Sequence, residues 1–317
     1  MIVALAGGVG GARLAVGLAV VLPPRELAFV VNTADDFEHL GLAISPDLDT
    51  VMYTLAGVNN RVMGWGRARE TWNFMSTLTA LGSEDWFRLG DRDLAVHVLR
   101  SAALRGGATL SDVTRALATR LGIRHRLLPM SDSPVGTRVN TDRGEMPFQD
   151  YFVRYACRPR VRGFRFVGSG KARPPRALQQ IIHSGRVRAV IICPSNPYVS
   201  IAPILSVPAI GAWLRRREFA VVAVSPIVGG AAIKGPAAKM MRELKHAPSA
   251  LGVAQHYGAL VDGWIIDEAD RSLRGAIERE GKAVMVTDTI MSNRRRSVRL
   301  ARCVDAFARS VAKERRT

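Results

Sequence analysis

Two stretches near the start of the chain carry residues that suit phosphate chemistry. The first is a glycine-rich turn, Gly7–Arg13. The second runs from Glu26 to Asn60 and holds six carboxylates without a Lys or Arg, in a chain whose formal charge is +18. Glycine turns let phosphate approach the backbone, and clustered carboxylates bind Mg²⁺ or accept a proton from a hydroxyl. Together the two stretches indicate phosphate chemistry near the N-terminus.

The glycine-rich turn follows an apolar run and precedes a helical pattern, which is the setting that a phosphate-binding loop requires. Gly7, Gly8 and Gly10 are the residues whose backbone we expect to approach a phosphate, and Arg13 could add a contact. The turn is not a Walker A loop because no Gly-Lys-Ser/Thr follows, and its spacing only approaches Gly-x-Gly-x-x-Gly. A tight strand-to-helix turn with a surface arginine is the alternative interpretation.

Two acidic pairs follow this turn. Asp35 and Asp36 come just after the second apolar run, and two consecutive acids are more than ribose binding in a dinucleotide enzyme needs. Asp47 and Asp49 stand two residues apart, so an extended backbone would place both side chains on one face. Asp49 can also cap the helix that starts near Thr50, and this role is compatible with catalysis or metal binding.

Further polar residues follow later segments. Ser195 and Asn196 come after the third apolar run, and Gly229 and Gly230 lie in a Pro-containing loop after the fourth. Loops of this composition suit nucleotide recognition through backbone groups. Arg88–Asp93 leads into a helix, and its Asp-Arg-Asp triplet is typical of a capping and ion-pair cluster. Polar loops at most strand ends indicate one long ligand groove.

The elements that must position these residues follow a strand-helix-strand rhythm. Helical segments such as Ala12–Leu22 and Ile204–Arg216 alternate with short apolar runs rich in Val, Ile and Ala. Six such runs predict buried parallel strands at Ile2–Ala6, Leu27–Val31, Ala189–Cys193, Phe219–Val224, Gly263–Asp267 and Ala283–Thr287. The pattern predicts the α/β class, with a doubly wound, mostly parallel, Rossmann-like sheet of about six strands.

The predicted sheet is interrupted by a large insertion. Residues 1–50 and 187–317 make up the Rossmann-like nucleotide-binding core, and residues 51–186 make up a mainly helical insertion. Amphipathic patterns around 69–81, 91–104 and 110–121 precede a strand pair or ribbon over 137–167. Because ligands bind at the carboxyl edge of open α/β sheets, we expect the insertion to cover the active site.

Composition limits the class of protein. A chain of 317 residues with 48% hydrophobic and 23% charged residues can bury a core. Its three separated cysteines and six scattered histidines form neither a disulfide framework nor a zinc spacing, so we expect a reducing, cytoplasmic location. The first apolar run indicates a buried strand rather than a signal peptide, and no run reaches the roughly 20 apolar residues of a membrane helix.

The excess positive charge gathers in three segments, 154–176, 215–217 and 294–316. Apolar residues in the last segment recur at helical spacing, which predicts a terminal helix docked by one face. We interpret the charge as a solvated surface rather than a nucleic-acid site, because no recognised nucleic-acid-binding motif accompanies it.

Several motifs, taken in order along nearly the whole chain, resemble one family: the 2-phospho-L-lactate transferases of coenzyme F-420 biosynthesis, called CofD in archaea and FbiA in actinobacteria. The motifs are GGVGGARL (7–14), VVNTADD (30–36), SPDLDTVMYTLAG (45–57), WG…ETW (65–72), LGDRDLAVHVLR (89–100), LLPMSDSPV (127–135), FQDYFV (148–153), PSNPYVSIAPIL (194–205), AVSPIVGGAAIKGPAAKMM (223–241) and TDTIM (287–291). No single motif decides the matter, but the ordered set is highly specific.

The resemblance implies a Mg²⁺-dependent transfer. The donor is a guanylylated phospho-acid, based on 2-phospholactate, phosphoenolpyruvate or 3-phosphoglycerate. The acceptor is the primary ribityl hydroxyl of FO (7,8-didemethyl-8-hydroxy-5-deazariboflavin), and GMP is released. Positioning and charge neutralisation would supply most of the catalysis. The family also suggests a homodimer.

The resemblance also implies roles for individual residues. Asp49 would contact FO as a base or through the metal, Asp35 would be a second metal or hydroxyl ligand, and Arg88 and Arg92 would bind FO or the developing phosphate charge. The nucleotide groove would be lined by Gly7, Gly8, Gly10, Arg13, Ser195, Asn196, Gly229 and Gly230. We interpret the lack of Lys and Arg between Glu26 and Asn60 as protection of these carboxylates, because a guanidinium would compete with Mg²⁺ and weaken a base.

Three of the acids in the stretch, Glu26, Glu38 and Asp47, are expected to be bystanders.

Two other functions stay open at this point. A nucleotide-dependent oxidoreductase on a Rossmann sheet would bind NAD(P) rather than a guanosine nucleotide. A basic nucleic-acid-binding protein would bind DNA or RNA with a steep salt dependence, but would give the acidic stretch no role.

Overall fold

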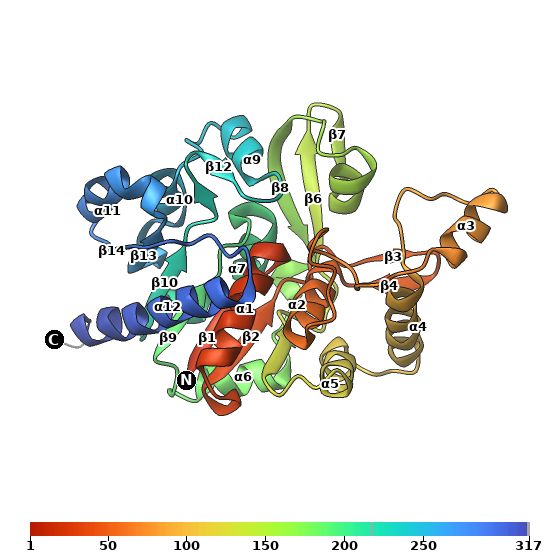
Figure 1. The fold of residues 1–317 in the computed structure, drawn as a ribbon, viewed down its shortest axis with the longest axis horizontal. Coiled ribbons are helices and arrows are strands. Elements are labelled where there is room, and N and C mark those ends of the chain that lie inside the picture. The colour runs from red at the N-terminus through yellow and green to blue at the C-terminus, as the bar shows by residue number, and fades with distance from the viewer. Residues whose placement is uncertain (217, 316–317) are drawn as a thin grey trace.

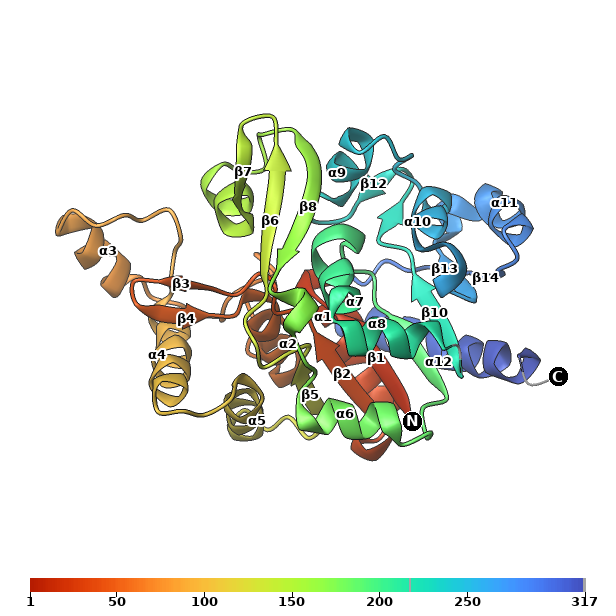
Figure 2. The same cartoon turned by 180° about the vertical axis from the view of Figure 1, so that it is seen from behind.

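The architecture is taken from a computed structural model, which describes residues 1–216 and 218–315. Its centre is a sheet of seven strands, each parallel to its neighbours. Across the sheet the strands run in the order β14 (Ala283–Val286), β13 (Gly263–Ile266), β10 (Ala220–Val224), β9 (Ala189–Ile192), β1 (Ile2–Ala6), β2 (Leu27–Val31) and β5 (Arg126–Pro129). Figures 1 and 2 show the molecule from opposite sides.

Helices cover both faces of the sheet. Alternate residues of β1 enter two separate apolar cores, Val3 and Leu5 on one face and Ile2 and Ala4 on the other. The first core is closed by α6 (Arg176–His183), α7 (Ala202–Ser206), α8 (Pro208–Arg215), α9 (Ala237–Glu243), α10 (Ala250–Tyr257) and α11 (Arg274–Arg279). The second is closed by α1 (Gly8–Val21), α2 (Pro46–Ala56), α4 (Asp91–Arg105), α5 (Leu110–Arg120) and α12 (Arg294–Glu314).

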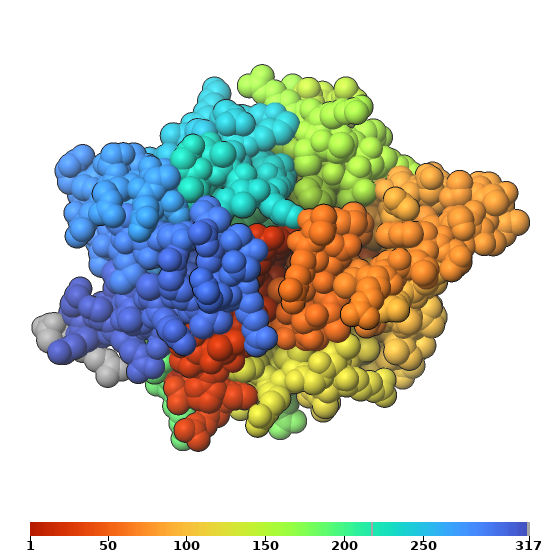
Figure 3. Space-filling view, viewed as in Figure 1, coloured from red at the N-terminus to blue at the C-terminus, as the bar shows by residue number. Residues whose placement is uncertain are grey.

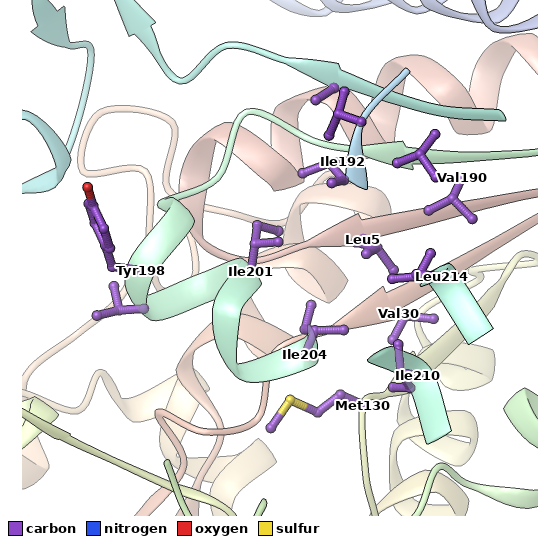
Figure 4. Packing of buried hydrophobic residues seen from close by; sticks show 14 of the residues in the cluster. Leu5, Val30, Met130, Val190, Ile192, Tyr198, Ile201, Ile204, Ile210 and Leu214 are labelled. Carbon is purple, nitrogen blue, oxygen red and sulfur yellow. The ribbon is translucent and has the colours of Figure 1, made fainter. Parts of the chain in front are cut away.

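Figure 4 shows the first core, in which Leu5 and Val30 of the sheet lie against Ile204 and Ile210 of α7 and α8. The five central strands are short and apolar throughout because neither face meets water, which removes the alternation of a half-exposed strand. This arrangement confirms the predicted doubly wound α/β sheet.

Local sequence signals fix the helices that matter for the site. Pro46 occupies the first turn of α2, where its missing N–H is not needed. Gly57 ends that helix with φ +71°, a left-handed conformation that glycine adopts without strain.

At the other end of the chain, Asn293 caps α12 by accepting a hydrogen bond from the Arg296 N–H (3.0 Å). The buried face of α12 confirms the predicted docked terminal helix; Arg217 and Arg316 of the basic segments lie outside the described residues.

The insertion contains most of the predicted elements, but it also supplies one that was not predicted. The helical patterns correspond to α3 (Asn73–Ala80), α4 and α5. The predicted strand pair is a three-stranded antiparallel sheet in the order β7 (Gly144–Pro147), β6 (Gly136–Thr141) and β8 (Val161–Val167). β5, placed within the insertion by the sequence, pairs in parallel with β2, so the main sheet has seven strands rather than six.

Smaller elements extend from the main body. The hairpin of β3 (Phe37–His39) and β4 (Leu42–Ile44) joins α3 and α4 around a third apolar core centred on Ile44, Met75 and Leu89. Figure 1 shows this group projecting to one side of the sheet. A second short hairpin, β11 (Ile227–Val228) and β12 (Ala231–Ala232), follows β10.

The sheet changes winding direction at its centre. β1 pairs with β2 on one side and with β9 on the other, so the loops leaving β1 and β9 diverge at the carboxyl edge. Open α/β sheets bind ligands at such a switch point.

Among the described residues, no single helix has the length and apolar character needed to cross a membrane. Pro197–Ser206 and Pro208–Arg215 meet those criteria only when joined, and they meet at a bend of 92°.

Candidate active site

A cavity of about 630 Å³ opens at the carboxyl edge of the sheet. Its walls come from the start of α1, the loops after β9 and β10, and the insertion. Nine of the residues predicted for the site line it: Gly7, Gly8, Gly10, Arg13, Asp35, Asp49, Arg88, Ser195 and Asn196. Figure 3 shows one face of this region, where the red start of the chain lies between the blue C-terminal part and the orange part of the insertion.

Three predicted residues do not line the cavity. The Arg92 side chain is exposed, and its backbone N–H donates to Glu70 Oε2 (2.7 Å). Gly229 and Gly230 form the exposed turn between β11 and β12, with φ values of +56° and +78°. Their glycines serve the tight turn, because residues with a Cβ rarely adopt these angles.

The glycine turn packs closely against the loop after β9. A Cβ on Gly10 would overlap the Pro194 carbonyl oxygen, and a Cβ on Gly11 would lie 2.6 Å from Ser195 Oγ. Ser195 Oγ donates to the Gly7 carbonyl (2.8 Å) and accepts from the Gly7 N–H (3.1 Å). The absence of side chains at these positions is therefore required by the fold of the turn itself.

The first turn of α1 faces a carboxylate. The Gly8 N–H donates to Asp47 Oδ1 (2.7 Å), and Asn32 Nδ2 donates to Asp47 Oδ2 (2.9 Å) and to the Val199 carbonyl (3.2 Å). Burial raises the pKa of Asp47 from 3.8 to about 6, although both hydrogen bonds oppose this shift. Asp47, predicted from the sequence to be a bystander, lines the cavity and joins the glycine turn to the residue that follows β2.

Asp35 lines the cavity and, with Asp47, forms what is called the acidic wall here; Asp36 follows Asp35 in the chain. Asp35 is buried and Asp36 is half-buried, and neither Asp35 Oδ1 nor Asp36 Oδ1 has a hydrogen-bond partner among the described residues. Burial raises the pKa of Asp35 well above its ordinary value, and the charge of Asp47 adds to the shift. Burial likewise raises the pKa of Asp36, against a hydrogen bond from Ser45 Oγ (2.7 Å). Burial thus disfavours the ionised form of both carboxyl groups.

Asp49 has a different environment. Both of its oxygens accept from the buried guanidinium of Arg100 on α4, and the distance from Nη1 to Oδ2 is 3.0 Å. Arg100 also donates to the Ala43 carbonyl (3.3 Å). The interpretation that no guanidinium approaches the acidic stretch is wrong, because helix packing brings Arg100 to it from 51 residues away.

The contact with Arg100 extends into a buried polar network. His97 Nδ1 lies 3.7 Å from Asp49 Oδ2, and His97 Nε2 lies 3.2 Å from Asp93 Oδ1. Tyr53 Oη donates to the same Asp93 oxygen (2.6 Å). Burial opposes the ionised form of Asp93, but the hydrogen bond and charge of His97 lower its pKa below the ordinary value. Asp49, Asp93 and His97 offer ligand atoms within 4.8 Å of one another, but the Arg100 charge beside Asp49 disfavours a cation there.

The remaining wall is aromatic. Trp65, Trp72, Trp86 and Phe87 line the cavity on the insertion side. The Arg88 guanidinium lies 4.3 Å from the centre of the Trp72 ring, which is a cation–π contact. The cavity thus has a polar part at the sheet edge and an aromatic part under the insertion, and the second part suits a flat ring.

Sequence reasoning did not identify Arg100 and His97, although a usable signal was present. Asp93, His97 and Arg100 follow at intervals of four and three residues, which places them on one face of a helix. The interval pattern alone could have grouped them, but nothing in the sequence indicates that this face turns toward Asp49.

Fold and site together define an α/β enzyme of Rossmann-like type with its cavity at the switch point of the sheet. A sequence profile described as "2-phospho-L-lactate transferase CofD" matches residues 2–304. The chain belongs to this family of transferases.

Similar proteins agree with this assignment. A 2-phospho-L-lactate transferase of Methanosarcina mazei is 40% identical over 299 residues, covering 94% of this chain and 97% of that protein. A phosphoenolpyruvate transferase of Kitasatospora aureofaciens is 41% identical over 317 residues, covering 98% of both. In fold alone, the chain resembles a crystal structure of a UPF0052 family member from Bacillus halodurans, with a TM-score of 0.61, 13% identity, and 96% and 97% of the two chains covered.

Proposed function

We propose that the protein transfers a phospho-acid from a guanylylated diphosphate donor to the primary ribityl hydroxyl of FO, as a step in coenzyme F-420 biosynthesis. The hydroxyl oxygen forms a bond to the phosphorus on the acid side. The bond from that phosphorus to the bridging oxygen breaks, and GMP leaves with the bonding electrons. The hydroxyl proton passes to a base, and a phosphodiester joins FO to the acid.

This proposal rests on the division of the cavity into a polar part and an aromatic part. At the sheet edge, the start of α1, Arg13 and the loop of Ser195 and Asn196 offer backbone N–H groups and positive charge to a nucleotide diphosphate. Under the insertion, Trp65 and Trp72 offer flat apolar surface to a deazaflavin ring. A donor and an acceptor bound in these two parts would meet beside the acidic wall, where the hydroxyl must lose its proton.

The acidic wall fits the Mg²⁺ that the family resemblance implies. The unpartnered Asp35 Oδ1 and the raised pKa values of Asp35 and Asp47 describe carboxylates that lack a counter-charge. We propose Asp35 and Asp47 as the residues that would hold Mg²⁺, in preference to Asp49: the donors to Asp47 are neutral, whereas Asp49 is paired with the charged guanidinium of Arg100. Bound there, Mg²⁺ would neutralise charge on the diphosphate.

The other residues would act by position. Asn32 holds Asp47 toward the glycine turn, so the carboxylate stays at the boundary between the two parts of the cavity. Arg88, fixed over Trp72, is placed to contact FO or the phosphate charge. We propose that Asp49 contributes by holding Arg100, since both of its oxygens accept from that guanidinium.

The direct test incubates the pure protein with FO, Mg²⁺ and each of three guanylylated donors, built on 2-phospholactate, phosphoenolpyruvate and 3-phosphoglycerate. Mass spectrometry of the products should show a phosphodiester of FO and an equal amount of GMP with at least one donor. Relatives named for 2-phospholactate and for phosphoenolpyruvate match at nearly equal identity. The preferred donor is therefore the one that gives the most product when the three donors are compared in this assay. Product without GMP, or no product with any donor, would contradict the proposal.

A binding experiment separates the proposal from the oxidoreductase alternative. GDP and GMP should raise the unfolding temperature of the protein, and NADH should not. Stabilisation by NADH alone would favour the oxidoreductase. The homodimer suggested by the family likewise remains a proposal, and light scattering on the eluting protein measures it directly.

A further inference from the structure

Two loops meet across the mouth of the cavity. The first, residues 59–67, is called the lid loop here. It is closed at its base by a bridge between Asn59 and Arg67. Its tip is shaped by Asn60 Oδ1, which accepts from the N–H groups of Val62 (3.0 Å) and Met63 (3.1 Å).

The second loop lies between β12 and α9, and its Lys234 binds the lid loop. Lys234 Nζ donates to the Met63 carbonyl (2.9 Å) and to the Val62 carbonyl (3.3 Å). These carbonyls are neutral, whereas ammonium groups in proteins bind most strongly to anions. Lys234 also lines the cavity, so its charge is available to a ligand as well as to the lid loop.

Lys234 lies beside the first turn of α1. A Cβ on Gly64 would be 3.0 Å from Lys234 Nζ and 3.1 Å from Val9 Cγ1. The ammonium is therefore within about 6 Å of the Val9 side chain, in the turn that we assign to the diphosphate. An ammonium has three N–H groups. Two contacts with the lid loop are formed within residues 1–216 and 218–315, which leaves one N–H for an oxygen at the α1 end of the cavity.

The lid loop also carries an aromatic residue into the cavity. Trp65 lines the cavity although it is 43% exposed, and the preceding Val62 is 89% exposed. With so little of its tip buried, the loop depends on polar contacts to stay in place. The two hydrogen bonds from Lys234 are such contacts, and in Figure 3 the orange lid segment adjoins the cyan segment that contains Lys234.

We propose that Lys234 is a positioning residue that couples donor binding to the placement of Trp65. In the free protein it holds the lid loop over the cavity through Val62 and Met63. When a diphosphate lies at the start of α1, the third N–H binds a phosphate oxygen, and the same ammonium then joins donor and lid loop. Trp65 is thereby fixed against the acceptor part. The identity of donor and acceptor rests on the proposed function, but the hold on the lid loop is a property of the free chain.

Trypsin provides a test that needs no activity, because Arg61 lies in the lid loop and is exposed. Mass spectrometry follows cleavage after Arg61 relative to cleavage after Arg124, an exposed site in the turn that follows α5. Without ligand, Lys234→Ala should be cleaved after Arg61 about three- to tenfold faster than wild type, since loss of hydrogen bonds to a charged donor raises the open population of the loop.

Three further variants control the test. Lys171→Ala removes the same charge from an exposed lysine away from the cavity, and it should match wild type. Lys234→Arg keeps a charged donor and should restore part of the protection. Asn60→Ala loosens the lid loop itself and should be cleaved faster while Lys234 remains. Equal cleavage of Lys234→Ala and wild type, with unchanged cleavage after Arg124, would overturn the proposal.

Ligand arms then test the coupling. GDP with Mg²⁺, or inorganic pyrophosphate with Mg²⁺, should slow cleavage after Arg61 in wild type and leave Lys234→Ala unaffected. In the transfer assay, Lys234→Ala should raise the KM for the acceptor more than it lowers kcat. If GDP protects both proteins equally, the coupling is wrong. If GDP neither protects nor thermally stabilises wild type, both the proposed function and the proposed coupling to the donor are wrong. The ligand-free comparison still decides whether Lys234 holds the lid loop.

Discussion

At the scale of single residues, the ion pair of Asp49 and Arg100 sets the character of the site. Both partners are buried, and ionised groups lose their hydration when they are removed from water. Such a pair stays in place because each charge stabilises the other. Asp49 is consequently an ion-paired carboxylate beside His97 rather than a free one.

Breaking this pair should destabilise the protein. Arg100→Met leaves the Asp49 carboxylate buried without its partner, and we expect the free energy of unfolding to fall by about 3–5 kcal/mol. The double variant Asp49→Asn with Arg100→Met should recover part of that loss, because no unpaired charge remains. Urea unfolding measures both. The exposed pair of Arg115 and Asp112 on α5 supplies the control: an effect of Arg100→Met no larger than that of Arg115→Met would contradict this view.

Asp47 and Asp49 should differ in their dependence on Mg²⁺. Asp47→Asn removes a proposed ligand, so the Mg²⁺ concentration for half-maximal activity should rise about tenfold or more. Asp49→Asn should lower activity and stability without moving that concentration. Titration of activity with Mg²⁺ distinguishes the two variants. A shift confined to Asp49→Asn would instead support the assignment made from sequence.

The sequence was enough to recognise the acidic stretch, but not to tell the environments of its carboxylates apart. Asp35 was predicted as a site residue and lines the cavity, because residues just after a parallel strand reach the carboxyl edge. Asp47 and Asp49 looked alike, since alternation along the chain gives both the same chance of facing a ligand. What separates them is their partners, Asn32 for Asp47 and Arg100 for Asp49, and these come from packing between distant elements.

At the scale of elements, the glycine turn and the loop after β9 act as one unit. Gly10 lies directly against the Pro194 carbonyl, and Ser195 is bonded to both backbone groups of Gly7. The two loops leave neighbouring strands of the sheet at the switch point. Their close packing holds the start of α1 at a fixed position relative to the cavity.

A methyl group at Gly10 should separate these loops. Gly10→Ala has no room beside the Pro194 carbonyl, and we expect a loss of about 1–3 kcal/mol in the free energy of unfolding together with a loss of activity. Gly275→Ala on α11 is the matched control, because its new Cβ would meet only Arg279 Nη1 at 3.8 Å. Thermal unfolding compares the two. Equal stability of both variants would show that the turn tolerates a side chain.

The prediction of elements succeeded where apolar runs were uninterrupted and failed where a charged residue or a proline replaced part of the run. β1, β2 and β10 were found because each has five consecutive buried residues. β5 was not found, because Arg126–Pro129 begins with an exposed arginine and ends with a proline. Such a strand is tolerated at the edge of a sheet, where one side needs no partner, and only its pairing with β2 reveals it.

At the scale of the whole molecule, the acidic wall makes stability depend on pH and on Mg²⁺. A carboxyl whose pKa is raised by folding binds its proton more tightly in the folded state, so its contribution is complete at low pH and is lost as pH rises. For Asp47 the loss runs from about pH 4 through its folded pKa of about 6, and the raised pKa values of Asp35 and Asp36 act in the same direction.

Without metal, the unfolding temperature should therefore be lower at about pH 8 than at about pH 5. Added Mg²⁺ should stabilise the protein more at the higher pH, because protons no longer compete for the carboxylates. Scanning fluorimetry with EDTA and with Mg²⁺ measures both effects. Asp47→Asn provides the control, since it should flatten the pH dependence. A stabilisation by Mg²⁺ that is the same at both pH values would argue against a carboxylate site.

The pairing of β1 also determines at which point of its synthesis the chain can complete its central sheet. Its neighbours are β2, which is made at once, and β9, which begins only at residue 189. Until then one edge of β1 has no partner, and an unpaired apolar strand is a template for association with other chains. The cavity is completed later still, by Thr289 and Met291. A ribosome therefore has to synthesise the chain beyond Met291 before the site exists, so a fragment that ends earlier would be inactive and prone to aggregate.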